Sequence, residues 1–172
     1  MKIEKDIEQV SRLIVRALEH GNKILTCGNG GSAADAQHFA GELLCKFKME
    51  RKSLPAVCLN CNVSVLTAIA NDYGYEQVFS RQVEGVGCLG DVLIAISTSG
   101  NSKNMVKAAK TAREKGLLVI GFTGARGGDV EQYCHICIKA PAIETPAIQE
   151  FHIKTLHEIC GRVEEGLFCK KL

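Results

Sequence analysis

The sequence predicts an α/β fold, a three-layer αβα sandwich built on a five-stranded parallel sheet. Short apolar runs of strand length alternate along the chain with segments in which apolar residues recur every three or four positions. Strands separated by helices favour right-handed crossovers, which make the strands parallel and cover both faces of the sheet. The 172 residues, 46 % of them hydrophobic, suit one well-buried core, so we expect a single domain over residues 1–172.

The first predicted element is an extra N-terminal helix over about residues 1–21. Its apolar residues form one broad stripe, and Gly21 is a typical helix stop. Because this helix precedes the sheet, we expect it to take part in packing between subunits.

The other elements then alternate. Residues 91–96 are a continuous apolar run typical of a buried parallel strand, and the segment after them carries small apolar residues at helical spacing. By the same reasoning strands are predicted at 23–27, 56–59, 91–96, 117–122 and 136–139. Helices are predicted at 32–47, 64–70, 77–86, 104–115 and 147–167, with residues 71–74 as a loop.

Composition and charge exclude several classes of protein. A net charge of +2 without a dense basic stripe gives no electrostatic case for nucleic acid. No apolar run approaches the roughly 18 residues that a membrane span needs, and residues 1–6 mix charges instead of forming a secretion signal. We therefore expect a soluble, cytoplasmic protein that binds neither nucleic acid nor membrane.

Nine cysteines include two pairs with the two-residue gap of zinc and redox sites, Cys58 with Cys61 and Cys134 with Cys137. However, Cys58 and Cys137 fall in predicted strands, where cysteine acts as a small hydrophobe. The odd total argues against a disulfide framework. We interpret the cysteines as free thiols, with a structural zinc on the pairs as the alternative.

The stretch 97–102, Ser-Thr-Ser-Gly-Asn-Ser, connects the end of a predicted strand to the start of a predicted helix. The first amides of a helix lack internal partners and carry partial positive charge, so this position suits a phosphate. The hydroxyls add donors, and Ser102 can cap the helix. An ordinary Ser/Gly turn is the alternative for this stretch alone.

A glycine loop, residues 28–32, follows the first strand. Gly28, Gly30 and Ala33 formally match the G-x-G-x-x-G/A dinucleotide fingerprint. That fingerprint also needs an acidic residue after the second strand, where this chain has Asn60-Cys61-Asn62. Because ligands bind beyond the carboxyl ends of parallel strands, this loop and residues 97–102 are expected at one rim. The loop suits a small polar ligand and not a nucleotide.

Histidine and acidic side chains gather in two predicted helices. His38 and Glu42 are four residues apart and share a helix face, a spacing that also occurs in plain surface pairs. The last helix carries Gln149, Glu150, His152, His157 and Glu158. Such groups can bind zinc or act as general acid and base. Gln149 and His157 are about 12 Å apart along the helix, so they reach one ligand only if their side chains converge or come from different subunits.

Four motifs in this order, residues 28–42, 65–75, 97–102 and 148–157, resemble the phosphoheptose isomerases, enzymes of the sugar-isomerase (SIS) domain family. The resemblance spans nearly the whole chain. It implies a flavodoxin-like sheet, a homotetramer with sites at subunit interfaces, and conversion of D-sedoheptulose 7-phosphate to D-glycero-D-manno-heptose 7-phosphate. That reaction is the first step towards heptose nucleotides for lipopolysaccharide or other surface glycans.

The resemblance also implies roles for individual residues. Glu42 and His157 match the catalytic acid–base pair, and one Zn²⁺ per site is implied. The zinc ligands would be His38, Glu42, Gln149 and His157. The substrate-binding residues would be Asn29, Gly30, Gly31, Ser32, Glu42, Asn71, Asp72, Ser97, Thr98, Ser99, Ser102 and Gln149.

Aldose–ketose isomerisation through an enediol fits these residue types. A carboxylate can take a carbon-bound proton, and an imidazole can exchange an oxygen-bound one. Which of Glu42 and His157 does which stays open. The family commonly has threonine and aspartate where this chain has residues 60–62, and arginine where it has Lys46.

Two other functions remain. One is a non-catalytic SIS adaptor of the type that binds a replication initiator, but that relative lacks the residues matching Glu42 and His157. The other is an isomerase of a different sugar phosphate, against which the motifs at Asn71–Asp72 and Gln149–His157 favour heptose.

Overall fold

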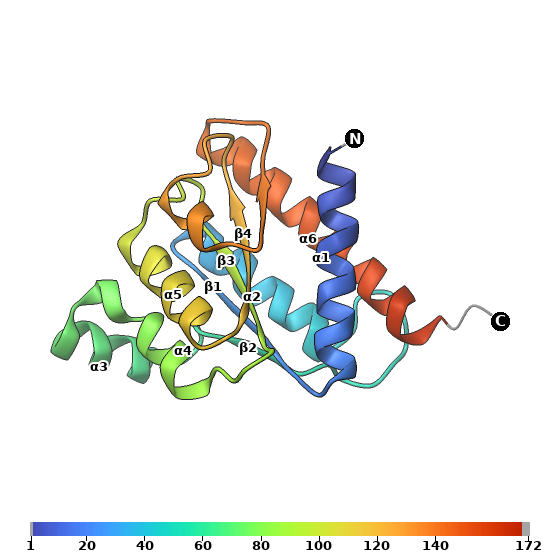
Figure 1. The fold of residues 1–172 in the computed structure, drawn as a ribbon, viewed down its shortest axis with the longest axis horizontal. Coiled ribbons are helices and arrows are strands. Elements are labelled where there is room, and N and C mark those ends of the chain that lie inside the picture. The colour runs from blue at the N-terminus through green and yellow to red at the C-terminus, as the bar shows by residue number, and fades with distance from the viewer. Residues whose placement is uncertain (1, 170–172) are drawn as a thin grey trace.

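A computed structural model describes residues 2–169 of the chain and confirms the predicted three-layer α/β architecture (Figure 1). One sheet of five parallel strands has the order β2-β1-β3-β4-β5. The strands are β1 (Ile24–Gly28), β2 (Ala56–Cys58), β3 (Val92–Ile96), β4 (Leu118–Thr123) and β5 (Ile136–Lys139). The helices are α1 (Lys2–Glu19), α2 (Gly31–Leu44), α3 (Val63–Tyr73), α4 (Ser80–Val86), α5 (Lys103–Glu114) and α6 (Thr145–Phe168), with short 3₁₀ turns η1 (Tyr75–Gln77) and η2 (Asp129–Tyr133).

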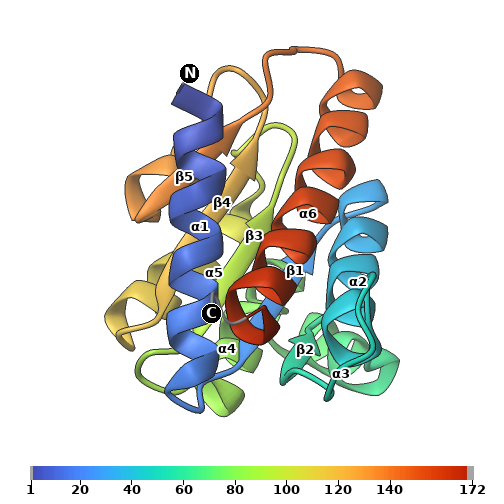
Figure 2. The ribbon, with the colours of Figure 1, turned by 90° about the vertical axis from the view of Figure 1, so that its right-hand side faces the viewer.

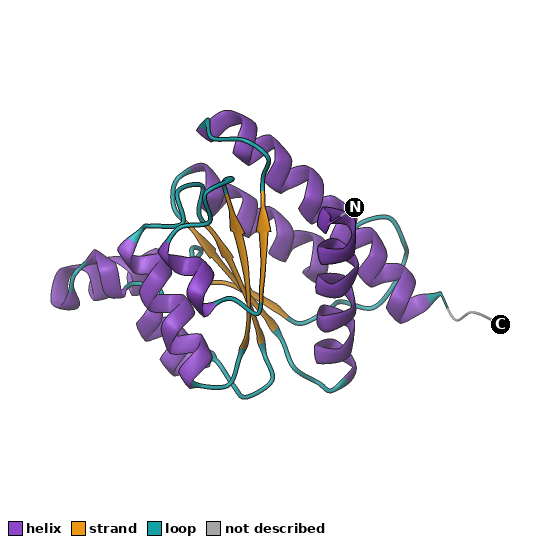
Figure 3. Cartoon of the chain, turned by 45° about the horizontal axis from the view of Figure 1, so that its top comes forward, coloured by secondary structure: helices purple, strands orange, loops and turns teal. Residues whose placement is uncertain are grey.

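Alternate residues of each strand enter two separate cores. In β3, Val92, Ile94 and Ile96 pack under α1, α2 and α6, whereas Leu93 and Ala95 pack under α4 and α5. This follows from the two-residue period of a strand, which sends neighbouring side chains to opposite faces. Figure 2 shows α1, α6 and α2 together in front of the sheet, and Figure 3 shows the twisted strands between the helical layers.

The apolar stripe of the N-terminal helix α1 is buried within its own chain. Ile7, Val10 and Ile14 are buried against the sheet and α6. The stripe from which we expected packing between subunits is therefore already covered, and a role of α1 in assembly would depend on its outer face.

Three predicted boundaries were wrong for identifiable reasons. The loop expected at residues 71–74 is helical as far as Tyr73, because the stop is Gly74, with φ 90° and its N–H bonded to Ala70 O at 3.1 Å. The helix expected at 77–86 is divided into η1 and α4. There the Ser80 hydroxyl donates to the carbonyl of Gln77 (3.2 Å), a side-chain bond that competes with helical pairing.

The third boundary is the end of α2, at Leu44 and not at residue 47. The guanidinium of Arg51 donates to three main-chain carbonyls at this end, those of Glu42, Leu43 and Cys45, at 2.7, 2.8 and 3.2 Å. These acceptors are among the last carbonyls of a helix, which have no internal partners. A distant side chain thus ends the helix.

The strand order reverses between β1 and β3, whose crossover connections leave in opposite directions. In open α/β sheets this switch point is where ligands bind, beyond the carboxyl ends of the strands. Gly28 ends β1 and Ile96 ends β3, so the glycine loop and the serine-rich loop start side by side. Within residues 2–169, no helix combines the length and apolar character needed to cross a membrane.

Candidate active site

The glycine loop and the serine-rich loop line one hollow of about 300 Å³, as their common rim predicted. Asn29, Gly30, Gly31 and Ser32 form one side of it, and Ser97, Thr98 and Ser102 form another. Thr145 and Gln149 of α6 close it. The first turns of α2 and α5 both face this hollow, so it collects unpaired main-chain N–H groups and suits an anion.

Two hydroxyls shape the serine-rich loop. Ser97 Oγ accepts the N–H of Gly100 at 3.2 Å, and Ser99 Oγ accepts that of Asn101 at 3.1 Å. Because each oxygen acts as an acceptor in the loop, its own proton stays available for a ligand. Ser102 is the N-cap residue of α5 as expected, but its side chain makes no capping bond.

Gly100 is required where two loops touch. Its φ is 67°, and a Cβ on it would overlap the carbonyl oxygen of Gly127. Only glycine enters this left-handed conformation without strain. Neighbouring Ser99 lies on a second hollow of about 320 Å³, lined also by Thr98, Arg126 and Thr145. Arg126 is a cation near the loop that the motifs gave no reason to select.

The glycine loop is fixed by side-chain amides. Asn60, the residue where a dinucleotide site would have an acid, holds Gly28 on both sides: its Nδ2 donates to Gly28 O (2.9 Å) and its Oδ1 accepts from Gly28 N (3.2 Å). Asn29 is held by Asn104 and Tyr75. At Gly31 a Cβ would overlap the side chain of Gln149, so the absence of a side chain lets Gln149 lie against the loop.

His38, Glu42 and His157 converge within one chain. His38 Nε2 lies 3.0 Å from Glu42 Oε1, and His157 Nε2 lies 2.9 Å from His38 Nε2. The three possible ligand atoms lie within 4.8 Å of one another, and no other such group of histidine, cysteine or acidic side chains occurs in the part of the chain that the structure describes. The predicted meeting of Glu42 with His157, 115 positions apart, is thus present in the fold.

This cluster fits a metal by the chemistry of its donors. Two imidazole nitrogens and one carboxylate oxygen are the ligand set of catalytic zinc sites, which keep a fourth position open for water or substrate. The facing nitrogens of His38 and His157 need one proton between them to form a hydrogen bond, and a cation could replace that proton.

The residues predicted on α6 separate onto different faces. Helices α2 and α6 run side by side in the same direction, since Gly31 meets Gln149 and His38 meets His157. Gln149 therefore lies at the glycine loop, about 12 Å along the helix from His157, and is not beside the His–Glu–His cluster of its own chain. His152 is in the core, with Nε2 3.1 Å from Thr123 O, and burial lowers its pKa. Glu158 pairs with Arg162 at 2.7 Å.

Asn71 and Asp72 are not brought to either hollow. Both are exposed near the end of α3, where Asn71 Nδ2 donates to Asp72 Oδ1 at 2.8 Å. Their contact with substrate stays a prediction, since neither residue lines the two hollows next to the glycine and serine-rich loops.

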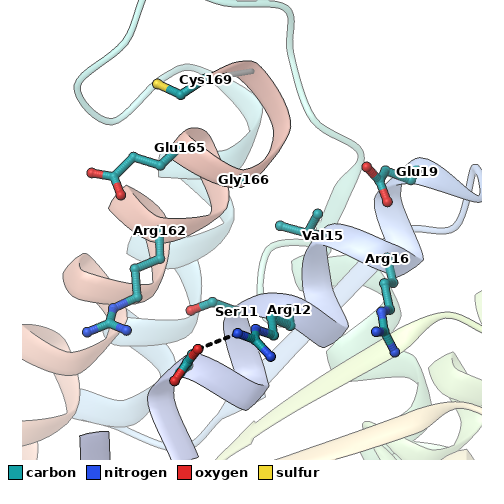
Figure 4. Close-up of a pocket in the computed structure, with 10 residues that line it drawn as sticks. Ser11, Arg12, Val15, Arg16, Glu19, Arg162, Glu165, Gly166 and Cys169 are labelled. Atoms are coloured by element: carbon teal, nitrogen blue, oxygen red, sulfur yellow. Dashed lines mark hydrogen bonds and ion pairs between the residues drawn. The ribbon is translucent and has the colours of Figure 1, made fainter. Parts of the chain in front are cut away.

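A larger hollow than these two lies elsewhere. A groove of about 630 Å³ lies between α1 and α6, lined by Ser11, Arg12, Val15, Arg162 and Gly166 among others (Figure 4). It contains no histidine, and its charged side chains include both signs. Its size alone does not make it a site, because it offers no acid–base pair and no helix N-terminus.

The cysteine pairs flank the sheet. Cys58 lies in β2 and Cys137 in β5, as expected for strand residues, but these are the two edge strands and both side chains are only half-buried. All nine cysteines fall within residues 2–169, and each is a free thiol there.

A family model described as "SIS domain" matches residues 2–124 of the chain. Among curated proteins, the chain is 53 % identical to a phosphoheptose isomerase of Aneurinibacillus thermoaerophilus over 165 residues, 96 % of this chain and 83 % of that protein. It is 51 % identical to a phosphoheptose isomerase of Rhodospirillum rubrum, over 94 % of this chain and 86 % of that protein.

The chain is also similar to solved structures of phosphoheptose isomerases. The phosphoheptose isomerase of Neisseria gonorrhoeae superposes with a TM-score of 0.87 at 43 % identity, covering 95 % of this chain and 90 % of that one. The phosphoheptose isomerase of Francisella tularensis gives a TM-score of 0.90 at 38 % identity, over 94 % and 86 %.

Proposed function

Because the chain belongs to the SIS-domain family, and within it to the phosphoheptose isomerases, we propose that it converts D-sedoheptulose 7-phosphate to D-glycero-D-manno-heptose 7-phosphate at the site formed by α2, α6 and the two loops. The observation that carries the assignment of the chemistry is the meeting of Glu42 and His157 beside His38. An acid–base pair is what separates an isomerase from a protein that only binds sugar phosphates.

The reaction moves hydrogen between two neighbouring carbons. One proton leaves C1 of the ketose while the C2 carbonyl oxygen gains a proton, which gives an enediol. A proton then returns to C2 while the O1 hydroxyl loses its proton, which gives the aldose. In our proposal Glu42 and His157 share these transfers, the carboxylate at carbon and the imidazole at oxygen.

His38, Glu42 and His157 would hold one zinc ion, with Gln149 as a further ligand if it comes from another copy of the chain. Bound there, zinc would polarise the substrate carbonyl and stabilise negative charge on its oxygen. The ordered contacts of His38 with both partners support this role, since they hold three donors together before any ion arrives.

The other end of the substrate would lie in the hollow of the two loops. We propose that Ser97, Thr98, Ser99 and Ser102 bind the phosphate, and that Asn29, Gly30, Gly31, Ser32 and Gln149 line the sugar. From Gly31 to His38 the axis of α2 rises roughly 10 Å. An extended seven-carbon chain with a terminal phosphate has about this length, since each carbon–carbon bond is about 1.5 Å. The spacing therefore suits a phosphorylated sugar of about this length.

The site would be completed by assembly. None of the residues of α3 is buried although most are apolar, and Val63 is 68 % exposed. Asn71 and Asp72, the residues expected on substrate hydroxyls, are on this helix. We propose a homo-oligomer in which α3 packs on another copy and carries Asn71 and Asp72 to that copy's site. The number four comes from the family resemblance alone. A charged sugar phosphate is retained inside cells, so the cytoplasm is the proposed location.

An assay of purified chain with D-sedoheptulose 7-phosphate, with and without added zinc, tests the function. We expect the aldose product from the wild type and none above background from Glu42→Gln or His157→Asn. Both side chains are partly exposed, so the variants should fold normally. Absence of turnover in the wild type under both conditions would reject the function. Full activity in either variant would reject the acid–base roles.

A further inference from the structure

A buried ion pair lies directly behind the His–Glu–His cluster. Arg51 Nε is 3.0 Å from Glu164 Oε1, and their side chains are only 1 % and 2 % exposed. Arg51 comes from the loop after α2, and Glu164 comes from the last quarter of α6. Buried ion pairs often contribute little net stability, because the loss of hydration offsets the attraction. The role of this pair therefore depends on which groups it holds in position, and not on its contribution to stability.

Glu164 organises the backbone of the loop. Its carboxylate accepts the main-chain N–H groups of Phe47, Lys48 and Met49 at 2.9, 2.9 and 3.0 Å. Burial alone would raise the pKa of this carboxyl, but the three N–H bonds and Arg51 outweigh it and hold the pKa below its ordinary value. Glu164 is thus a charged anchor for three consecutive residues.

The loop held by Glu164 places the aromatic ring of Phe47 next to His157. The phenyl ring of Phe47 lies against the imidazole with a centroid distance of 5.4 Å and an angle of 16° between the planes. His38 meets the imidazole at 4.9 Å with a tilt of 58°. Rotation about the last torsion of a histidine has only broad preferences, so a neighbour must fix the ring. A near-parallel phenyl ring favours one orientation of the imidazole, because aromatic rings in contact prefer specific packing geometries.

The guanidinium of Arg51 also contacts Glu42, the other residue of the proposed acid–base pair. Arg51 Nη2 donates to the main-chain oxygen of Glu42 at 2.7 Å. One side chain therefore bonds directly to the backbone of Glu42 and, through Glu164 and Phe47, acts on the ring of His157.

We propose that Arg51, Glu164 and Phe47 are positioning residues for the isomerase, with the buried ion pair setting the distance and ring orientation between Glu42 and His157. This inference rests on the roles proposed above for Glu42 and His157. None of the three needs to touch substrate. Their effect is on kcat, because they fix the reacting groups while leaving the phosphate-binding loops unchanged.

The test compares Phe47→Leu, which keeps apolar volume but loses the flat ring, with Phe47→Tyr, which keeps the ring. Phe168→Leu, at the exposed end of α6, is the matched control. We expect Phe47→Leu to lower kcat between about 10- and 100-fold, the range that small misplacements produce, with KM for D-sedoheptulose 7-phosphate nearly unchanged. Phe47→Tyr should keep kcat within a few-fold of the wild-type value. Phe168→Leu should have the same kcat as the wild type.

A second readout does not depend on turnover. In the wild type the stacked phenyl shields the ring protons of His157, so their NMR resonances should move downfield in Phe47→Leu and in Glu164→Gln but not in Phe168→Leu. If Glu164→Gln does not fold, Phe47→Leu still decides the matter. Glu114→Gln, which removes the partner of an exposed lysine, is the control for loss of a glutamate charge.

Wild-type kcat in Phe47→Leu, or equal losses in Phe47→Leu and Phe47→Tyr, would overturn the proposal. If the wild type itself lacks isomerase activity, the proposed function fails. The resonances of His157 would then still show whether Phe47 orients the ring, and unchanged resonances would overturn that part as well.

Discussion

The side-chain amides of Asn29 and Asn104 bond each other in both directions. Asn29 Nδ2 donates to Asn104 Oδ1 at 2.9 Å, and Asn104 Nδ2 donates to Asn29 Oδ1 at 2.8 Å. Tyr75 Oη donates to the same Asn29 oxygen at 3.1 Å. With both lone pairs of that oxygen used, the Asn29 side chain has one N–H left. Asn29 thus joins the glycine loop to the first turn of α5.

The first prediction concerns this amide pair. Asn104→Leu keeps the branched shape of the side chain at a position that is 3 % exposed but removes both bonds. Because the amide of Asn29 loses its partner, the free energy of unfolding should fall by about 1–3 kcal/mol. The KM for substrate should rise, since the two loops that line the hollow are no longer joined. Urea unfolding and initial rates measure these effects, with Lys103→Leu at the exposed neighbour as the control. Unchanged KM in Asn104→Leu would contradict the prediction.

The second prediction concerns two glycines. Gly100→Ala should destabilise the chain by more than about 1–2 kcal/mol, since the left-handed conformation alone costs about that much and the new Cβ overlaps Gly127 O. Gly41→Ala is the matched control: it lies inside α2 with open space around it, so alanine should stabilise by about 0.5–1 kcal/mol. Thermal unfolding of both variants measures the difference, and two shifts of the same sign would contradict it.

The third prediction concerns acid. The folded pKa of Glu164 is lowered, so the stabilisation that its charge supplies is fully present above the unfolded pKa of about 4.3. It is lost as pH falls through the lower folded pKa. Glu164→Gln should therefore be less stable than the wild type at pH 7 by about 3–5 kcal/mol, because Arg51 is left buried without a counter-charge. The gap in melting temperature should narrow below about pH 4. A gap that stays constant with pH would argue against an ionised Glu164.

The fourth prediction concerns the proposed metal. Purified chain should contain about one zinc per copy, and His38→Ala should lose most of it while the chain still folds, since the His38 side chain is 45 % exposed. A chelator should lower wild-type turnover, and added zinc should restore it. A double variant, Cys61→Ser with Cys134→Ser, distinguishes the cluster from the cysteine pairs. If that variant loses its zinc while His38→Ala keeps it, the metal is on the thiols.

The strands were predictable almost to the residue because each contains a short, mostly apolar run between helical patterns, and the central strands β1, β3 and β4 are buried on both faces. The two loops were predictable because glycine and serine have few other reasons to cluster after such strands. The boundaries that failed depend on contacts far along the chain: α2 ends where Arg51 reaches back, and no local pattern contains that information.

The site was partly predictable for the same reason. Glu42 and His157 could be selected by residue type and motif, but the side chains that hold them could not. Glu164 binds a loop about 115 positions earlier, and Asn104 binds Asn29 at a separation of 75. Phe47 is an unremarkable apolar residue until the fold places it on His157. A weak signal existed at Glu164, an acidic residue next to Val163 on the buried face of α6.

Helix α3 has no fully buried side chain, and only Leu66, Ile69 and Ala70 pack partly on the core; Figure 1 shows the helix at the margin of the molecule. A helix without buried side chains opens at little energetic cost, so its amide hydrogens should exchange with solvent much sooner than those of α5. Dilution that separates the copies should speed that exchange, whereas exchange in β3 should be unaffected. If α3 packs on another copy as proposed, the hydrogen-exchange rate of this helix reports how much of the protein is assembled.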